Sequence, residues 1–283
     1  MVTGWADNDL DGALAYVQSM PKGKERSSLA MALVNNLTEQ DPSRALAFIQ
    51  LEKTDANSAN SSLRSLFAMW GRTDPQSAAQ KLMTLPATQR DYVMRYFVSA
   101  WAKDAPEAAL AFVQSLPNSN GKRYAFTAAL GELALTNPEL AAQESLKVSA
   151  AYRRDVVGAV VSNWAEKDLN GARNFVHSLT EGPVKQRALT NLGNKWAQTD
   201  PLGAADFALQ LPNGSTRNGL IRSVASVWSQ SDPLGAMQWA NGLPDNSTKS
   251  SSMQAIVTNM ASRDPANAAK WIEQIPSSVL GVK

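Results

Sequence analysis

Cysteine is absent from the 283 residues, and histidine occurs once, as His177. The missing cysteine excludes disulfides, thiol catalysis and cysteine-ligated metals. A catalytic histidine needs an orienting partner and a nucleophile, and the chain offers neither at a regular spacing from His177. We therefore expect His177 to be a solvated surface side chain.

Long apolar runs are also absent. No stretch of about 18 apolar residues could span a bilayer, so we expect no membrane insertion. Residues 1–5 lack the apolar core of a signal peptide. Asn, Ser, Thr and Gln are abundant, which leaves the compartment open and favours an exported or periplasmic protein over a cytoplasmic one.

An excess of charge of one sign is also absent: 27 Lys and Arg residues nearly balance 25 Asp and Glu residues, and the formal net charge is only +2. Such a balance gives little support for a nucleic-acid or membrane surface. The sequence contains no metal-ligand cluster, no glycine-rich phosphate loop and no GxSxG motif. We expect no enzyme activity, no cofactor and no metal.

What the sequence does contain is a repeat. The segment WAQTDPLGAADFALQLP, from Trp196 to Pro212, recurs with variations along the whole chain. Successive copies begin 31 to 33 residues apart, and such regular spacing is the signature of a repeat array. The first residue of each copy, called the anchor, is Trp5, Leu37, Trp70, Trp101, Leu133, Trp164, Trp196, Trp228 or Met260.

Each copy predicts a helix that begins after the anchor. Asp200 is a good N-cap, and Pro201 suits the first helical position. Ala204, Phe207 and Leu211 then follow at helical spacing on one apolar face, and Pro212 ends the segment. We call this segment helix A.

A small residue stands eight positions after every anchor, and we expect it to let two helices approach closely. In all nine copies it is alanine: Ala13, Ala45, Ala78, Ala109, Ala141, Ala172, Ala204, Ala236 and Ala268. With these alanines we assign to the repeat core the tryptophan anchors Trp70, Trp101, Trp164, Trp196 and Trp228. The alternative for the tryptophans is a stacking platform for sugars or bases, and only Tyr92 and Tyr96 stand off the apolar stripe.

A second apolar helix, called helix B, is expected in the sequence between a polar turn and the next anchor, and we expect it to end at that anchor. The sequence thus predicts about 17 helices, as eight hairpins plus a ninth helix A. The fold class is all-α, a right-handed α-α superhelix (solenoid) of about nine helix-hairpin repeats. We expect one domain over 1–283, which is a fragment of a longer repeat protein. The alternative is a complete chain whose divergent terminal repeats act as caps.

Two copies depart from the pattern. The copy from Leu133 to Ser149 lacks the tryptophan, the aromatic residue and the Leu-Pro stop, so curvature or function could change there, or it has simply drifted. In the second copy a polar stretch over 55–61 predicts a longer loop.

The Asp-Pro helix starts, such as Asp41-Pro42 and Asp232-Pro233, and the small residue on a facing helix resemble the tetratricopeptide-like superfamily. The pattern is most similar to bacterial repeats of the form WAxxDPxxA…LP. The period here is near 32 residues rather than the 34 of tetratricopeptide repeats. This resemblance implies the architecture, and by analogy a concave face lined by helix A.

Basic residues form a second regular series, eleven residues before the anchors. This basic series consists of Arg26, Arg90, Lys122, Arg153, Lys185, Arg217 and Lys249; Ala59 interrupts it. One hypothesis is a row of cations that binds an acidic peptide or an anionic polymer. The alternative is structural, in which each cation reaches the carbonyls at the end of helix A or a neighbouring Asp cap.

The sequence favours a non-catalytic scaffold that binds a protein or peptide on its concave face. On helix A, the candidate binding residues are Asp206, Gln210, Gln238 and Asn241, beside Leu202, Gly203 and Leu234. Two alternatives remain: an enzyme on a helical toroid, and a modular binder of RNA or another anionic polymer that uses the basic series.

Overall fold

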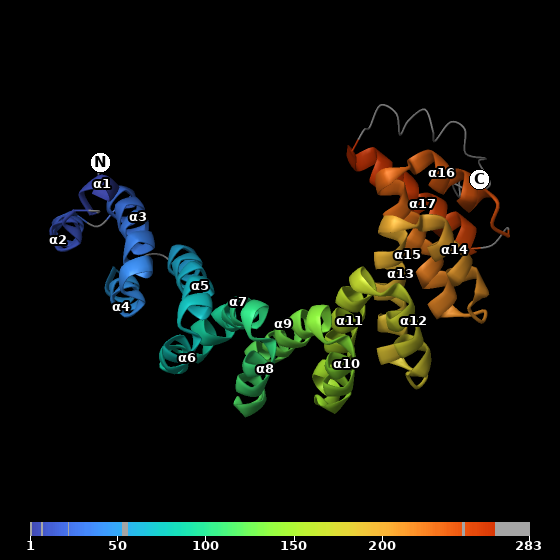
Figure 1. Cartoon of the computed structure of the whole chain (residues 1–283). Helices are drawn as coiled ribbons and strands as arrows, with labels where there is room; N and C mark the ends of the chain where they lie inside the picture. The colour runs from blue at the N-terminus through green and yellow to red at the C-terminus, as the bar shows by residue number, and fades with distance from the viewer. Residues whose placement is uncertain (1, 7, 22, 53–55, 245–246, 264–283) are drawn as a thin grey trace. The chain divides into compact units, whose positions relative to one another are not determined.

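The computed structural model describes residues 2–6, 8–21, 23–52, 56–244 and 247–263. Seventeen helices and no strand occur in these residues (Figure 1). The all-α prediction is therefore confirmed, with each helix packed mainly on its neighbours in sequence, as in a solenoid.

Short and long helices alternate along the chain. The short helices, of 9–11 residues, are helices A: α2 (Leu10–Ser19), α4 (Pro42–Glu52), α6 (Pro75–Met83), α8 (Pro106–Ser115), α10 (Pro138–Lys147), α12 (Leu169–Ser178), α14 (Pro201–Gln210) and α16 (Pro233–Asn241). The long helices, of 17–18 residues, are helices B: α3 (Lys24–Gln40), α5 (Ala56–Thr73), α7 (Ala87–Asp104), α9 (Asn120–Thr136), α11 (Ala150–Lys167), α13 (Pro183–Thr199), α15 (Ser215–Ser231) and α17 (Ser247–Arg263).

The described helices number seventeen, but their make-up differs from the prediction. They are eight A–B hairpins preceded by α1 (Val2–Ala6), which holds Trp5. The expected ninth helix A, with Ala268, lies outside the described residues. The predicted loop over 55–61 is wrong from residue 56 onward, because α5 begins at Ala56.

One residue joins each helix B to the following helix A. Asp200 ends α13 and begins α14, so helix B continues past the anchor Trp196 to Thr199 instead of ending there as expected. The side chain of Asp200 accepts a hydrogen bond from the Gly203 backbone N–H at 2.9 Å. Equivalent cap bonds of 2.9–3.2 Å are made by Asp9, Asp41, Asp74, Asn137, Asp168 and Asp232.

The repeated alanines lie in the core. All eight in the described residues, from Ala13 to Ala236, are fully buried. Trp70, Trp164 and Trp228 are buried as expected, whereas Trp101 and Trp196 are half-buried. For Trp196 a reason is visible: its indole Nε1 donates to Asp200 Oδ2 at 3.2 Å and keeps that edge of the ring near the surface.

The chain divides into two compact units, residues 1–136 and 137–283. The division falls within the divergent copy that begins at Leu133. The expectation of a single domain stays a prediction.

Within each unit the helices B form one closely packed layer. In unit 1, α5, α7 and α9 pack side by side, and α11, α13, α15 and α17 do so in unit 2. Small residues permit this approach: a Cβ on Gly71 would lie 2.8 Å from the Phe97 carbonyl oxygen, and one on Gly193 would lie 2.2 Å from Leu220 Cδ1.

Consecutive helices A make few or no contacts with one another, and within each unit they lie on the same side of the B layer (Figure 1). In a two-layer stack of hairpins, the layer with closer spacing lies on the inside of the curve. The expectation that helix A lines the inner face is therefore wrong within each unit, because the closely spaced layer consists of helices B.

Candidate binding surface

The helices B bury one face and expose the other. The buried face consists mostly of the positions three, four, seven and eight residues before the anchor. The other face consists of the positions two, five, six and nine residues before the anchor and the position two residues after it, and these are mostly exposed or half-buried. We call this second set the B face. Its spacing follows from the helical period, which places these positions on one side.

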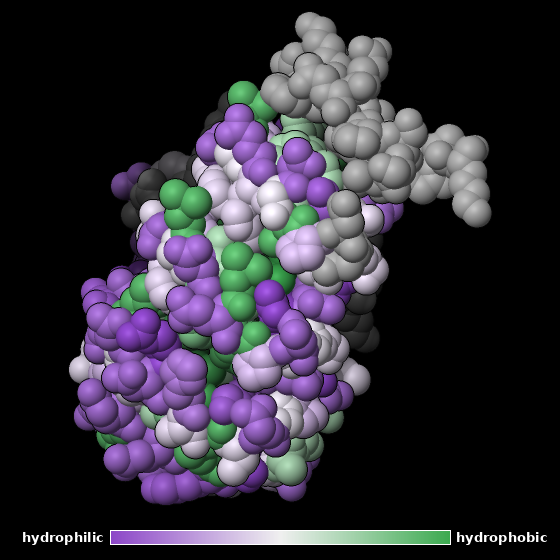
Figure 2. All heavy atoms as spheres, turned by 90° about the vertical axis from the view of Figure 1, so that its right-hand side faces the viewer, coloured by the Kyte–Doolittle hydropathy of each residue, from purple (hydrophilic) through white to green (hydrophobic). Residues whose placement is uncertain are grey.

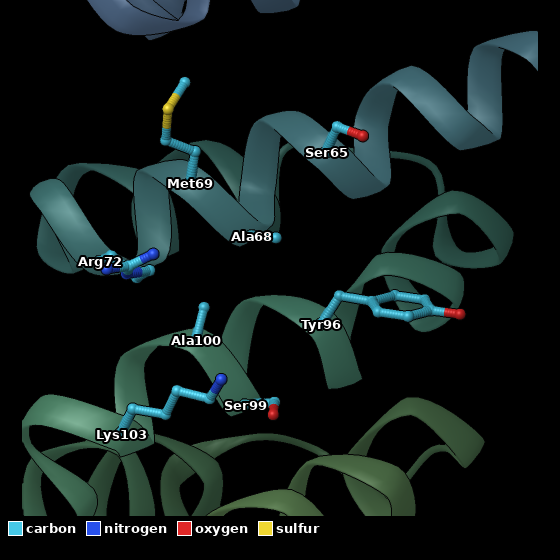
Figure 3. Close-up of a pocket in the computed structure, with 8 residues that line it drawn as sticks. All are labelled: Ser65, Ala68, Met69, Arg72, Tyr96, Ser99, Ala100 and Lys103. Atoms are coloured by element: carbon cyan, nitrogen blue, oxygen red, sulfur yellow. The ribbon is translucent and has the colours of Figure 1, made fainter.

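A groove lies between α5 and α7 on the B face of unit 1. Its volume is about 460 Å³, and its lining comes from four equivalent positions on each helix (Figure 3). We call it the α5–α7 groove; it is lined by Ser65, Ala68, Met69, Arg72, Tyr96, Ser99, Ala100 and Lys103.

The groove has a cationic end and an aromatic end. Figure 3 shows Arg72 and Lys103 at one end and Tyr96 at the other, with Ala68 between them. Arg72 and Lys103 are both exposed, and neither has an ion-pair partner within the described residues. The cationic end therefore carries two uncompensated charges.

Arginine and tyrosine side chains surround the aromatic end. The guanidinium carbons of Arg64 and Arg95 lie 5.5 and 4.6 Å from the Tyr96 ring centroid, and Arg95 Nη2 donates to the Tyr96 hydroxyl at 3.2 Å. On α9, Arg123 lies 4.5 Å from the ring centroid of the exposed Tyr124. Cation–π contacts of this kind attract a guanidinium group to the ring face by about 0.5–1 kcal/mol at exposed sites.

The equivalent positions in unit 2 bond to one another instead. Asn191 Nδ2 donates to the Gly158 carbonyl at 2.8 Å, and Asn194 pairs with Ser223. Asn259 Nδ2 donates to the Ser226 carbonyl at 2.9 Å. These three asparagines thus bond within the B layer, in contrast to the two cations of the α5–α7 groove.

Side chains of the basic series reach back to the end of helix A. Arg26 Nη1 donates to the carbonyls of Gln18 and Met20 at 2.9 and 2.8 Å, and Lys122 Nζ makes the equivalent bonds to Gln114 and Leu116. Arg153 and Lys185 donate to the carbonyls of Val148 and His177. This is the geometry of the structural alternative, and a binding role for the series stays a prediction.

The candidate residues on helix A are solvent-exposed. Asp206 and Gln210 on α14, with Gln238 and Asn241 on α16, are open to solvent but lie on the helices outside the B layer. The face of unit 2 seen in Figure 2 is mainly hydrophilic, with apolar side chains showing between the polar ones. None of these four helix A residues lines a cavity described in the structure.

A second, smaller cavity of about 300 Å³ lies near the turns of unit 2. Arg217 of the basic series lines it, together with Leu209, Asn213 and Leu243. Arg217 Nη1 donates to the Asn213 side chain. This cation therefore already has an acceptor beside the cavity.

His177 is exposed, as expected, with its ring edge-on to Phe207 at 6.1 Å. Within the described residues, no group of three or more His, Asp or Glu side chains could hold a metal ion. The Asp74 carboxyl, near the end of α5, has a pKa below its usual value because the side chain and backbone N–H of Ser77 donate hydrogen bonds to it.

Sequence reasoning identified part of this surface. Tyr92 and Tyr96 were singled out because they stand off the apolar stripe, but Arg72 and Lys103 were not. A usable signal was present: both cations stand two residues after an anchor, so they are equivalent positions on consecutive helices B.

Comparison with protein-family models, with curated proteins and with solved structures returned no match for this chain. The resemblance to tetratricopeptide-like arrays therefore stays a prediction. In the described part of the chain, no helix combines the length and the apolar character needed to cross a bilayer.

Proposed function

We propose that this protein is a non-catalytic scaffold that binds a protein or peptide partner on the B face. The observation that carries the proposal is a contrast between two positions of helix B. The position four before the anchor is apolar and fully buried in every described repeat: Leu33, Leu66, Phe97, Ala129, Val160, Leu192, Val224 and Ile256. The position six before the anchor differs widely between repeats: Met31, Arg64, Arg95, Thr127, Gly158, Thr190, Arg222 and Gln254.

A regular core with a varied exposed face is what a modular binding array needs. Stacking requires the same apolar contacts in each repeat, so the core positions stay alike. Recognition of one partner requires different contacts along the array, so the exposed positions differ. The packed B layer also provides a rigid support for such contacts, which lowers the entropic cost of binding.

Site-specific photo-crosslinking in the native host tests the proposal. A photoreactive amino acid would replace Ser65, Thr127 or Arg222 on the B face, and Gln210, Gln238 or Asn241 on helix A in the matched set. We expect the B-face positions to form covalent products with a shared partner protein, identified by mass spectrometry. Products from the helix A positions alone, or from none, would contradict the proposed function.

A further inference from the structure

The α5–α7 groove differs from the other described parts of the B face in charge. Arg72 and Lys103 converge at one end without an ion-pair partner in the described residues, and Arg64 and Arg95 lie close to the other end. By contrast, Lys195 on the B layer of unit 2 is paired with Glu166. A complementary ligand must therefore bring negative charge to this groove.

The groove also offers apolar atoms. Ala68 and Ala100 present methyl groups between its ends, and the Tyr96 ring presents an apolar body. A volume of about 460 Å³ is at the lower end of the range for ligand pockets and accommodates a few side chains. A ligand that matches this lining would combine an anionic group with a nearby apolar group.

We propose that the α5–α7 groove binds a short acidic segment of a partner protein. A carboxylate of the segment lies at the Arg72–Lys103 end, and an aliphatic or aromatic side chain lies at the Tyr96 end. This inference rests on the proposed function, because it names the chemistry of the partner for the same surface.

The distribution of cations favours an acidic peptide over a nucleic acid. At the positions equivalent to Arg72 and Lys103, the B face of unit 2 carries Glu166, Gln198, Gln230 and Ser262, so the basic track needed to follow a phosphate backbone does not continue there.

Selection from a displayed library of random 12-residue peptides, with the full chain as bait, tests the proposal. We expect enrichment of Asp or Glu close to Leu, Phe or Tyr. The best enriched peptide, fluorescently labelled, would then be titrated by anisotropy against the wild type and the double variant R72Q/K103Q. We expect at least a tenfold higher Kd for the double variant.

A matched control removes two charges elsewhere. Lys81 and Lys167 are exposed and lie outside the groove, so K81Q/K167Q should change the Kd by less than twofold. Circular dichroism melts of both variants would establish that they are folded. Hydrogen exchange of the wild-type complex should show protection in α5 and α7.

Three outcomes would overturn the proposal: no enriched peptide, enriched peptides without acidic residues, or equal binding by R72Q/K103Q. Tighter binding of a uridine 12-mer than of the selected peptide, lost in R72Q/K103Q, would assign the groove to nucleic acid instead. If R72Q/K103Q binds the selected peptide as tightly as the wild type does, the groove proposal is rejected. If Thr127 and Arg222 still crosslink to the shared partner protein in that case, the proposed function stands.

Discussion

At the residue scale, glycines stand where another group comes too close for a Cβ. A methyl group on Gly203 would lie 2.1 Å from the cap carboxylate of Asp200 and 2.9 Å from the Trp196 indole nitrogen. A methyl group on Gly71 would lie nearest to backbone, 2.8 Å from the Phe97 carbonyl oxygen, and 3.0 Å from the Phe97 ring, at the contact between α5 and α7. These glycines are needed for packing, although glycine weakens a helix by its flexibility.

A pair of alanine substitutions separates packing from flexibility. At Gly219 of α15, a Cβ would meet nothing within 4 Å, so Gly219→Ala should raise the free energy of unfolding by about 0.5–1 kcal/mol. Gly71→Ala forces the backbone of α7 to shift and should lower it by about 1–3 kcal/mol. Urea denaturation followed by circular dichroism measures both; a stabilised Gly71→Ala variant would show that the contact is loose.

At the element scale, helix A and the following helix B are connected by side-chain hydrogen bonds as well as by the backbone of the turn between them. A cation early in helix B is unfavourable for its own helix dipole. In this fold the cation reaches the carbonyls at the end of the preceding helix A, where positive charge is favourable. Arg26, Lys122, Arg153 and Lys185 of the basic series make such bonds and thereby link helix B to the preceding helix A.

Adjacent arginines on α11 test this role. Arg153 Nη2 donates to the Val148 carbonyl at 2.9 Å, whereas Arg154 is exposed and lies 3.7 Å from Asp155 in an ion pair between chain neighbours. Arg153→Met should lower the free energy of unfolding by about 1 kcal/mol, because a charge-assisted hydrogen bond is lost. Arg154→Met should change it by less than about 0.5 kcal/mol. Equal losses in chemical denaturation would exclude the specific role of Arg153.

At the scale of the whole molecule, each helix packs mainly on those next to it in sequence. The stability of such an array is a sum over repeats and their interfaces, so a local weakness stays local. The division into residues 1–136 and 137–283 adds a boundary that a disturbance has to cross.

Hydrogen exchange measured by mass spectrometry shows how far a disturbance spreads. In the Gly71→Ala chain, we expect faster exchange in α5 and α7 and unchanged exchange in α15 and α17. The Gly219→Ala chain is the control and should show no acceleration in either unit. Uniform acceleration along both units would mean that the array unfolds as one cooperative block.

The repeat made most of the fold predictable, because its signals are local. An N-cap such as Asp200 and the proline after it set a helix start whatever surrounds them. The end of helix B was placed at Trp196, three residues too early, because the chain can stay helical up to the Asp200 cap. Trp196 was assigned wholly to the core, but its bond to Asp200 depends on a side-chain conformation that sequence spacing does not reveal.

By itself, the sequence determined the helices, their order and their buried alanines, because hydrophobic period and capping act over a few residues. Only the tertiary structure decided that helices B form the closely packed layer within each unit, since that depends on how closely Gly71 and Gly193 let the next helix approach. It also brought Arg72 and Lys103, which are 31 residues apart, to one end of the α5–α7 groove. Charges on different helices come together only when the hairpins stack.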